Sequence, residues 1–325
     1  MHNRPELQAL RGDDTPQRHA QSAIRAVHQR WLTQGPGQQA EAEVALFAGG
    51  AVLDDLPLLS ALFAPDDDSA DQFVGDLVAP LLEQLAAEPL SQVPLRYATD
   101  ETHTSLLIAR HDTTRLVLLA IDGVGLARKP APTSVSFGPT ETIERVLAGS
   151  AEAIRVRALA LRPDSAELAC EPHTLRPGSV QHRIGACEAQ LLLRVPAQWV
   201  TLKLQRRTGA GEVTRQYRLS DGQLLHQAAG NPRDSRLELN AALLGRMGRS
   251  DAAPLLAAMA EEQGSSALRW QALRECLGLD SAAGFSALCR ISQNAGDPLA
   301  APAGALRAQL LESYPELAGA CPCPA

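Results

Sequence analysis

The chain has 325 residues, of which 45% are hydrophobic and 21% are charged, and its formal net charge is −7 at pH 7. This length and balance are typical of a folded protein of two or three domains and exclude an intrinsically disordered chain. The acidic charge and the aromatic content of 3% argue against nucleic acid and membrane partners, because both reward a concentrated basic surface and single strands also need stacking aromatics.

The sequence has no apolar run long enough for a signal peptide or a membrane-spanning helix, so we expect a cytoplasmic protein. Among the six cysteines, Cys321 and Cys323 alone lie close together, in the Pro-rich end of the chain. Two thiolates could hold a soft metal there. We favour a disordered tail over residues 319–325, because chain ends fray unless they are tied down.

Residues 1–92 are predicted to form an N-terminal helical region. Apolar residues recur at helical spacing in segments 17–32 and 69–88, which places Ile24, Val27 and Trp31 on one face of the first segment. The breakers "QGPGQQ" and "APDDDSAD" separate these segments, so we expect three or four helices. The pattern does not decide whether they form their own domain or pack against the next one.

Residues 93–230 change to short apolar runs separated by turn residues. The runs on either side of "HDTT" predict a hairpin, and at least eight strands are expected in the region. Few helical periods lie between them, which favours an antiparallel barrel or sandwich over a parallel sheet with crossover helices. Near its end, Arg206 and Arg215 flank a predicted turn; we interpret them as charges that protect a strand edge, with phosphate recognition as the alternative.

Two segments of this region carry spacings typical of a known family. The segment "TSVSFGPTETIERVLAG" contains Ser134, Ser136 and Glu141, and "LRPGSVQHRIG" contains His182 after a Pro-Gly pair. The region resembles the cupins, jelly-roll barrels whose metal ligands are paired histidines with a later glutamate, followed by a histidine after Pro and Gly. The resemblance implies a cupin-like barrel over this part of the chain.

Serines stand where the family has its paired histidines. Serine hydroxyls are poor ligands for divalent transition metals, so the resemblance implies a barrel without the usual metal centre. Its interior would then hold an organic ligand or be filled by side chains. The candidate ligand-binding residues are Ser134, Ser136, Glu141 and His182.

The alternative is a metal-dependent enzyme, an oxygenase or isomerase, with a non-standard ligand set. Ligands in a barrel can come from different strands, so histidines that are distant in sequence could converge. The candidate metal ligands are His111, His173, His182 and His226, together with Glu141. Without such a divalent metal we expect no cofactor, and no catalytic residue is assigned.

Residues 231–318 are predicted to form stacked helical hairpins. A shift of 33 residues aligns Leu244 with Leu277 and Gly245 with Gly278. A fixed period of this length resembles the HEAT-like repeats, whose stacked hairpins form extended surfaces for protein partners. A plain helical bundle is the alternative.

Three arginines of this region are candidates for a partner surface, namely Arg236, Arg269 and Arg274. They could line a groove, or they could cap helices and form salt bridges between them. Together the three regions predict an α+β multidomain protein. We expect a non-catalytic binding or regulatory protein, in which the helical repeats hold a protein partner and the β region binds a small ligand.

Overall fold

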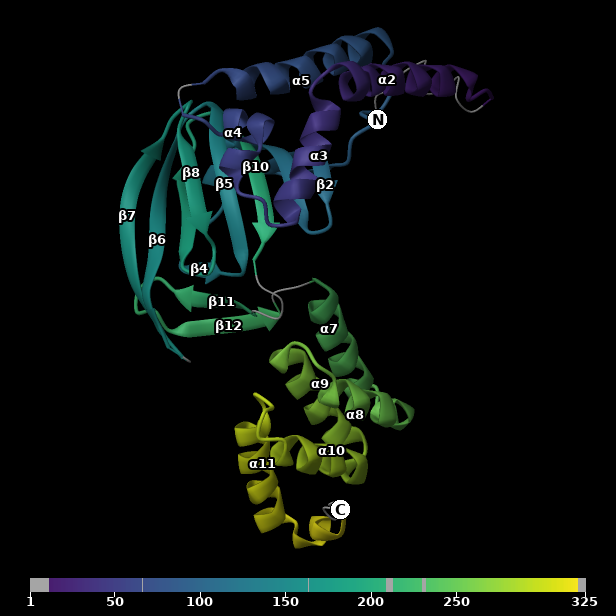
Figure 1. Cartoon of the computed structure of the whole chain (residues 1–325), viewed down its shortest axis with the longest axis vertical. Helices are drawn as coiled ribbons and strands as arrows, with labels where there is room; N and C mark the ends of the chain where they lie inside the picture. The colour runs from purple at the N-terminus through teal and green to yellow at the C-terminus, as the bar shows by residue number, and fades with distance from the viewer. Residues whose placement is uncertain (1–11, 66, 163, 209–212, 230–231, 321–325) are drawn as a thin grey trace.

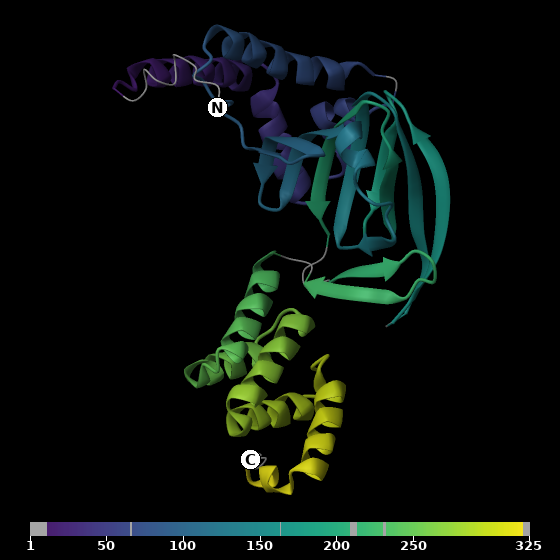
Figure 2. The ribbon, with the colours of Figure 1, turned by 180° about the vertical axis from the view of Figure 1, so that it is seen from behind.

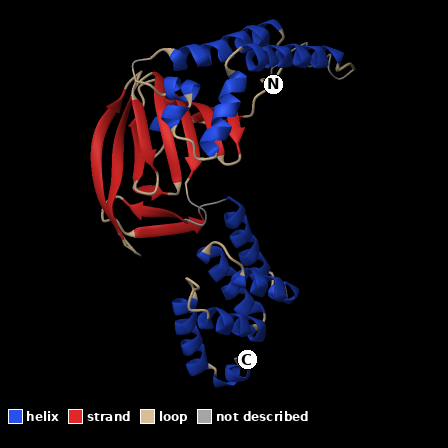
Figure 3. Ribbon diagram, in the orientation of Figure 1, coloured by secondary structure: helices blue, strands red, loops and turns tan. Residues whose placement is uncertain are grey.

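The computed structural model describes residues 12–65, 67–162, 164–208, 213–229 and 232–320. Helices come first in the chain, antiparallel sheets lie in the middle, and helices follow again (Figure 1, Figure 3). This confirms the predicted α+β multidomain class. Cys321 and Cys323, for which we favoured a disordered tail over a soft-metal site, lie outside the described residues.

The described part of the N-terminal region contains four α-helices and one 3₁₀ turn. They are α2 (Thr15–Gln34), α3 (Gly37–Ala48), η1 (Leu53–Asp55), α4 (Pro57–Leu62) and α5 (Ser69–Ala87). The predicted spacing holds in α2, whose buried positions include Ile24, Val27 and Trp31. The buried Glu43 carboxylate of α3 accepts the backbone N–H groups of Leu58 and Leu59, which satisfies the first turn of α4 and fixes it against α3.

Twelve strands follow among the described residues: β1 (Tyr97–Thr99), β2 (His103–His111), β3 (Thr114–Asp122), β4 (Ser134–Phe137), β5 (Thr140–Ala148), β6 (Ala151–Leu161), β7 (Ala166–Leu175), β8 (Val180–Ile184), β9 (Glu188–Arg194), β10 (Gln198–Arg207), β11 (Val213–Arg218) and β12 (Leu224–Ala229). A short helix, α6 (Gly123–Ala127), follows β3 and was not predicted. The β2–β3 pairing confirms the predicted hairpin.

The strands form three antiparallel sheets. The largest has the order β1-β2-β3-β10-β5-β8, and the other two have the orders β12-β11-β4 and β7-β6-β9. Gly149 lies where the chain leaves β5 in the large sheet for β6 in another. Its φ is 77°, and a Cβ there would lie 1.9 Å from the carbonyl oxygen of Gln198, so this crossing requires glycine.

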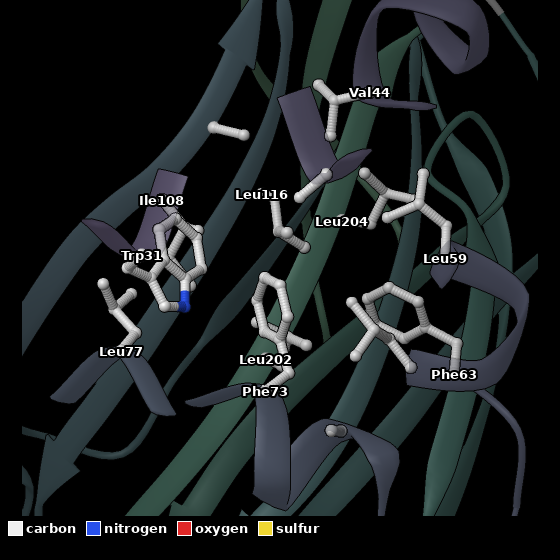
Figure 4. Packing of buried hydrophobic residues seen from close by; sticks show 14 of the residues in the cluster. Trp31, Val44, Leu59, Phe63, Phe73, Leu77, Ile108, Leu116, Leu202 and Leu204 are labelled. Carbon is white, nitrogen blue, oxygen red and sulfur yellow. The ribbon is translucent and has the colours of Figure 1, made fainter. Parts of the chain in front are cut away.

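One hydrophobic core joins the N-terminal helices to the six-stranded sheet. Phe63 and Phe73 of the helical region pack with Leu116, Leu202 and Leu204 of the sheet (Figure 4). α3 and α4 lie over this face of the sheet in Figure 1. The helices therefore cover the sheet and share its core, which answers the question that the sequence left open.

The C-terminal region is helical and has a separate core. Its elements are α7 (Pro232–Arg246), η2 (Ser250–Ala252), α8 (Ala253–Glu261), α9 (Ser266–Leu279), α10 (Ser281–Gln293), α11 (Ala300–Ser313) and η3 (Pro315–Ala320). η3 extends into the segment predicted as a tail, whose remainder, residues 321–325, lies outside the described residues. None of the described helices combines the length and the apolar composition that a membrane crossing needs.

Every second α-helix of the C-terminal region begins at a regular interval along the chain. α7, α9 and α11 begin at residues 232, 266 and 300, so successive starts lie 34 residues apart. α9 packs against α7, α8 and α10, and α10 packs in turn against α11. Gly284 lets α10 approach α9 closely, because a Cβ there would lie 2.6 Å from the backbone of Leu277. Membership of the HEAT-like class stays a prediction.

Candidate functional site

Glu141 and His182 lie together, as the resemblance implied, but on the face of the large sheet that the helices cover. Nε2 of His182 lies 2.8 Å from Oε1 of Glu141, and Nε of Arg206 donates to Oε2 of Glu141 over 2.5 Å. Arg206 also donates to the carbonyl oxygens of Phe47 and Ala51, and its guanidinium lies 4.0 Å from the centre of the Phe47 ring. The Arg206 cation therefore caps the C-terminal end of α3.

This cluster explains Glu141 as a structural residue. Its carboxylate is almost fully buried and holds Arg206 in place, whereas the side chain of His182 is 55% exposed. Arg206 is thus not a charge on an open strand edge. Neither Glu141 nor His182 points into the space between the sheets, because both share a sheet face with Ile143, which packs in the core beneath the helices.

Ser134 and Ser136 lie on β4, in a different sheet from Glu141 and His182. The hydroxyl of Ser134 accepts a hydrogen bond from Nε2 of Gln216 over 2.7 Å, and Ser136 is exposed. The four candidate ligand-binding residues therefore do not form one site. The cupin-like spacing grouped these residues by their positions in the sequence. β4 belongs to a different sheet from β5 and β8, so Ser134 and Ser136 are separated from Glu141 and His182.

The four candidate histidines are also dispersed. His111 ends β2, His226 lies exposed on β12, and Nε2 of His173 lies 3.4 Å from Oε1 of Gln190. Within the described ranges, no three side chains of His, Cys, Asp or Glu come close enough to hold a metal ion together. The metal ligands expected for the alternative hypothesis, a metal-dependent enzyme, therefore do not come together among the described residues.

A charged cluster lies between the large sheet and the β7-β6-β9 sheet. The buried Glu144 carboxylate of β5 accepts hydrogen bonds from Nη2 of Arg183 over 2.6 Å and from the hydroxyl of Thr201 over 3.1 Å. Nζ of Lys203 lies 3.3 Å from Oε1 of the same carboxylate. Arg183 reaches across to Gln190 of β9. Paired charges therefore occupy part of this space, and apolar clusters lie elsewhere between the sheets.

The environment of Glu144 perturbs its acidity. Burial alone would raise the pKa of this carboxyl, but the cations of Lys203 and Arg183 outweigh burial and lower the pKa below its ordinary value of 4.5. A lowered pKa in the folded state means that the ionised carboxylate stabilises the protein above the unfolded value. That stabilisation is lost as the pH falls through the folded value.

We therefore expect the free energy of unfolding to fall as the pH is lowered below about 4.5, and the Glu144→Gln variant to show a smaller fall over the same range. Urea unfolding at a series of pH values measures both. The exposed carboxylate Glu167 of β7 supplies the control, Glu167→Gln, which should follow the unchanged protein. Parallel pH curves for all three proteins would contradict the assignment.

The three candidate arginines of the C-terminal region have different environments. Arg236 is exposed on α7 and Arg274 is exposed on α9. Arg269 is 4% exposed; it donates to the carbonyl oxygen of Ala260 and forms a two-pronged ion pair with Asp297. Arg269 therefore belongs to the interior of the helical region and is not part of a partner surface, since its charge is consumed by internal contacts.

Arg274 lines a groove of about 680 Å³ between α9, α11 and η3. We call it the α9–α11 groove. Its lining is mostly apolar and consists of Trp270, Leu277, Leu306, Leu310, Tyr314 and Leu317, with the exposed charges Arg274 and Glu316. Tyr314 is 54% exposed, so its ring is accessible from solvent at this groove. This groove is the candidate functional site.

Sequence reasoning found one residue of the groove and missed its apolar lining. Trp270, Arg274 and Leu277 follow one another at helical spacing on α9, a pattern that could have indicated a second apolar face beside the buried one. Leu306 and Leu310 continue this surface from α11. That pairing depends on how α9 and α11 pack against α10, which spacing alone does not give.

No family model matches the sequence, and no curated protein is similar to it. Among solved structures, the chain is similar to KdgF from Halomonas sp. (14% identity, 34% of this chain, 88% of that chain, TM-score 0.24) and to a cupin superfamily protein from Desulfitobacterium hafniense DCB-2 (12%, 34%, 83%, 0.23). The Drosophila melanogaster CENP-C cupin domain is also similar (8%, 35%, 77%, 0.27). Cupin-fold neighbours thus cover the central β region. Identities and TM-scores this low carry nothing about activity or ligands.

Proposed function

We propose that this protein is a non-catalytic binding protein whose C-terminal helices hold a helical segment of a protein partner in the α9–α11 groove. The observation that carries the proposal is the open apolar groove itself, about 680 Å³ in volume. A soluble protein seldom leaves such a surface uncovered unless something binds to it. The groove lies between α9 and α11, and a third helix can pack against two helices at once.

The residue types in the groove support a protein partner. Trp, Tyr and Arg dominate the binding energy of protein interfaces, and Trp270, Tyr314 and Arg274 all line this groove. The expected partner segment is an amphipathic helix whose apolar side chains recur every three or four residues. An acidic side chain of that segment would meet Arg274, because this guanidinium is exposed beside the apolar lining.

Site-specific crosslinking in cells tests the proposal. A photoreactive amino acid at Ser281, an exposed residue of the lining, should crosslink the full chain to one reproducible protein through an amphipathic helical peptide. The same amino acid at Ala258, exposed on α8, serves as the position control. Equal products from both positions, or no product from Ser281, would contradict the proposal, and a crosslink to a second copy of this chain would replace it with self-association.

Two substitutions then test the groove directly. Tyr314→Ser and Arg274→Glu change exposed residues, so the fold should survive, and each should weaken partner binding by about tenfold or more. Arg246→Glu on α7 makes the same charge change at an exposed position that does not line the groove. Binding titration of the crosslinked partner's peptide gives the affinities. A loss caused equally by Arg246→Glu would show that net charge, and not the groove, controls binding.

A further inference from the structure

A second pocket lies where the β region meets the C-terminal helices. β11 and β12 lie at the end of the β region nearest α7 and α9 (Figure 1, Figure 2). A pocket of about 450 Å³ opens here, lined by Phe137, Val213 and Tyr217 of β4 and β11 and by Ser266 and Ala267 of α9. Boundaries between structural regions are common places for small-molecule sites, and this volume lies within their usual range.

The hydroxyl of Tyr217 lacks a hydrogen-bond partner among the described residues. The side chain is 0% exposed, and its ring packs against Phe137 with 6.1 Å between ring centres. A buried tyrosine hydroxyl ordinarily finds a partner, because burying it without one costs free energy. Tyr217 is among the residues that line the pocket, so a bound molecule that reaches this hydroxyl would supply the missing acceptor.

Another part of the lining carries the positive end of a helix. α9 has 14 residues and begins beside the pocket, where the side chain of Ser265 accepts the backbone N–H of Leu268. The N–H groups of Ser266 and Ala267, in the first turn, have no acceptor within the helix. Such N–H groups, together with the helix dipole, attract anions.

The side chains around the pocket favour the same charge. Arg215 lines it, and its Nε donates over 3.3 Å to Oε1 of Gln227, which also lines it. Of the described residues in the lining, none is Asp or Glu. Leu161, Phe137 and Val213 provide an apolar surface for the body of a ligand. The lining therefore combines positive charge at one part of the pocket with apolar contact at another.

We propose that this pocket binds a small organic anion, with its carboxylate or phosphate group accepting hydrogen bonds from Tyr217, Arg215 and the first turn of α9. The apolar body of the anion packs against Phe137, Leu161 and Val213. This site is distinct from the α9–α11 groove and goes beyond the proposed partner binding. Arg215, interpreted from the sequence as protection of a strand edge, then takes part in anion recognition.

Titration with three probes tests the site in the full chain. Benzoate offers a carboxylate on an apolar ring, benzamide is its neutral counterpart, and inorganic phosphate offers the anion alone. Backbone NMR shifts at Ser266 and Ala267 report binding at this pocket. We expect benzoate to bind with a Kd below about 10 mM and to shift both amides, with benzamide at least about tenfold weaker. If phosphate also binds at these amides, the expected ligand carries a phosphate group. If only benzoate binds there, the expected ligand carries a carboxylate.

Two variants separate the site from a general surface effect. Tyr217→Phe removes only the hydroxyl, and Arg215→Gln removes only the charge; each should weaken benzoate by about tenfold. Tyr217→Phe without ligand should be at least as stable as the unchanged protein in thermal unfolding, because it removes a buried group without a partner. The control Arg218→Gln, on the same strand but paired with Asp221, should leave binding unchanged.

Several results would overturn the proposal. The proposal is wrong if neither benzoate nor phosphate shifts the amides of Ser266 and Ala267 at about 10 mM. It is also wrong if benzamide binds as tightly as benzoate. Unchanged benzoate affinity in Tyr217→Phe and Arg215→Gln would also overturn it, as would an equal loss in Arg218→Gln. None of these results bears on the α9–α11 groove, whose test uses different residues and a protein partner.

Discussion

Replacing Arg269 with alanine is expected to lower the free energy of unfolding of the C-terminal helices by about 3–5 kcal/mol. The guanidinium is buried and joins three parts of the region. It extends from α9 and contacts Ala260 at the end of α8 and Asp297 before α11. Its removal leaves the Asp297 carboxylate without its counter-charge in a buried setting. Asp297 also accepts the backbone N–H of Leu299, so the start of α11 should loosen as well.

Hydrogen exchange measured by mass spectrometry gives the size and place of this effect. Amides of α9 and α11 should exchange faster in Arg269→Ala, and those of β3 and β10 should not change, because the helical region has its own core. The control is Arg290→Ala, which removes an exposed ion pair with Glu261 and should cost about 0–1 kcal/mol. Equal losses in the two variants would show that burial does not raise the importance of the Arg269 pair.

Replacing Phe73 with alanine is expected to destabilise the N-terminal helices and the six-stranded sheet together, by about 3–5 kcal/mol. Phe73 is buried, meets the Trp31 ring edge-on with 5.4 Å between ring centres, and belongs to the core that contains Leu202 of β10. Figure 4 shows its ring beside Leu202. The alanine variant leaves a cavity between the helices and the sheet, so both lose contacts.

The same exchange measurement distinguishes a shared core from two separate ones. Amide protection in α5, β3 and β10 should fall together in Phe73→Ala, while protection in α9 stays unchanged. Leu82→Ala, at a position of α5 that is 59% exposed, is the control and should have little effect. Loss of protection in α5 alone would contradict a shared core and would make the helices a domain of their own.

The sequence predicted the elements of the β region better than the direction of their side chains. β5 is buried at all positions from 141 to 146, because helices cover one face of its sheet and another sheet covers the opposite face. The alternation that normally tells the two faces of a strand apart is therefore missing. Glu141 was a candidate and Glu144 was not, although Glu144 is the residue that lies between the sheets.

A similar limit applies to the C-terminal region. The helical period was visible in the sequence, but Arg269 and Arg274 were indistinguishable as charged residues on one helix. Five residues of helix separate them by about 140° around its axis, so one is buried and the other is exposed. Which face is buried depends on the contacts of α9 with α7, α8 and α10, and these become known only when the helices are assembled.

The shared core also determines where this chain can be cut for laboratory production. A fragment beginning at residue 93 would retain the strands but lose the cover over Leu116, Ile143, Leu202 and Leu204. It would also lose the carbonyl groups of Ala64 and Asp67 that accept hydrogen bonds from the buried Arg145 of β5. Such a fragment should aggregate, because its uncovered apolar face would be exposed to other molecules. A shorter protein that retains residues 12–229 keeps the helices over this face and should not aggregate in this way.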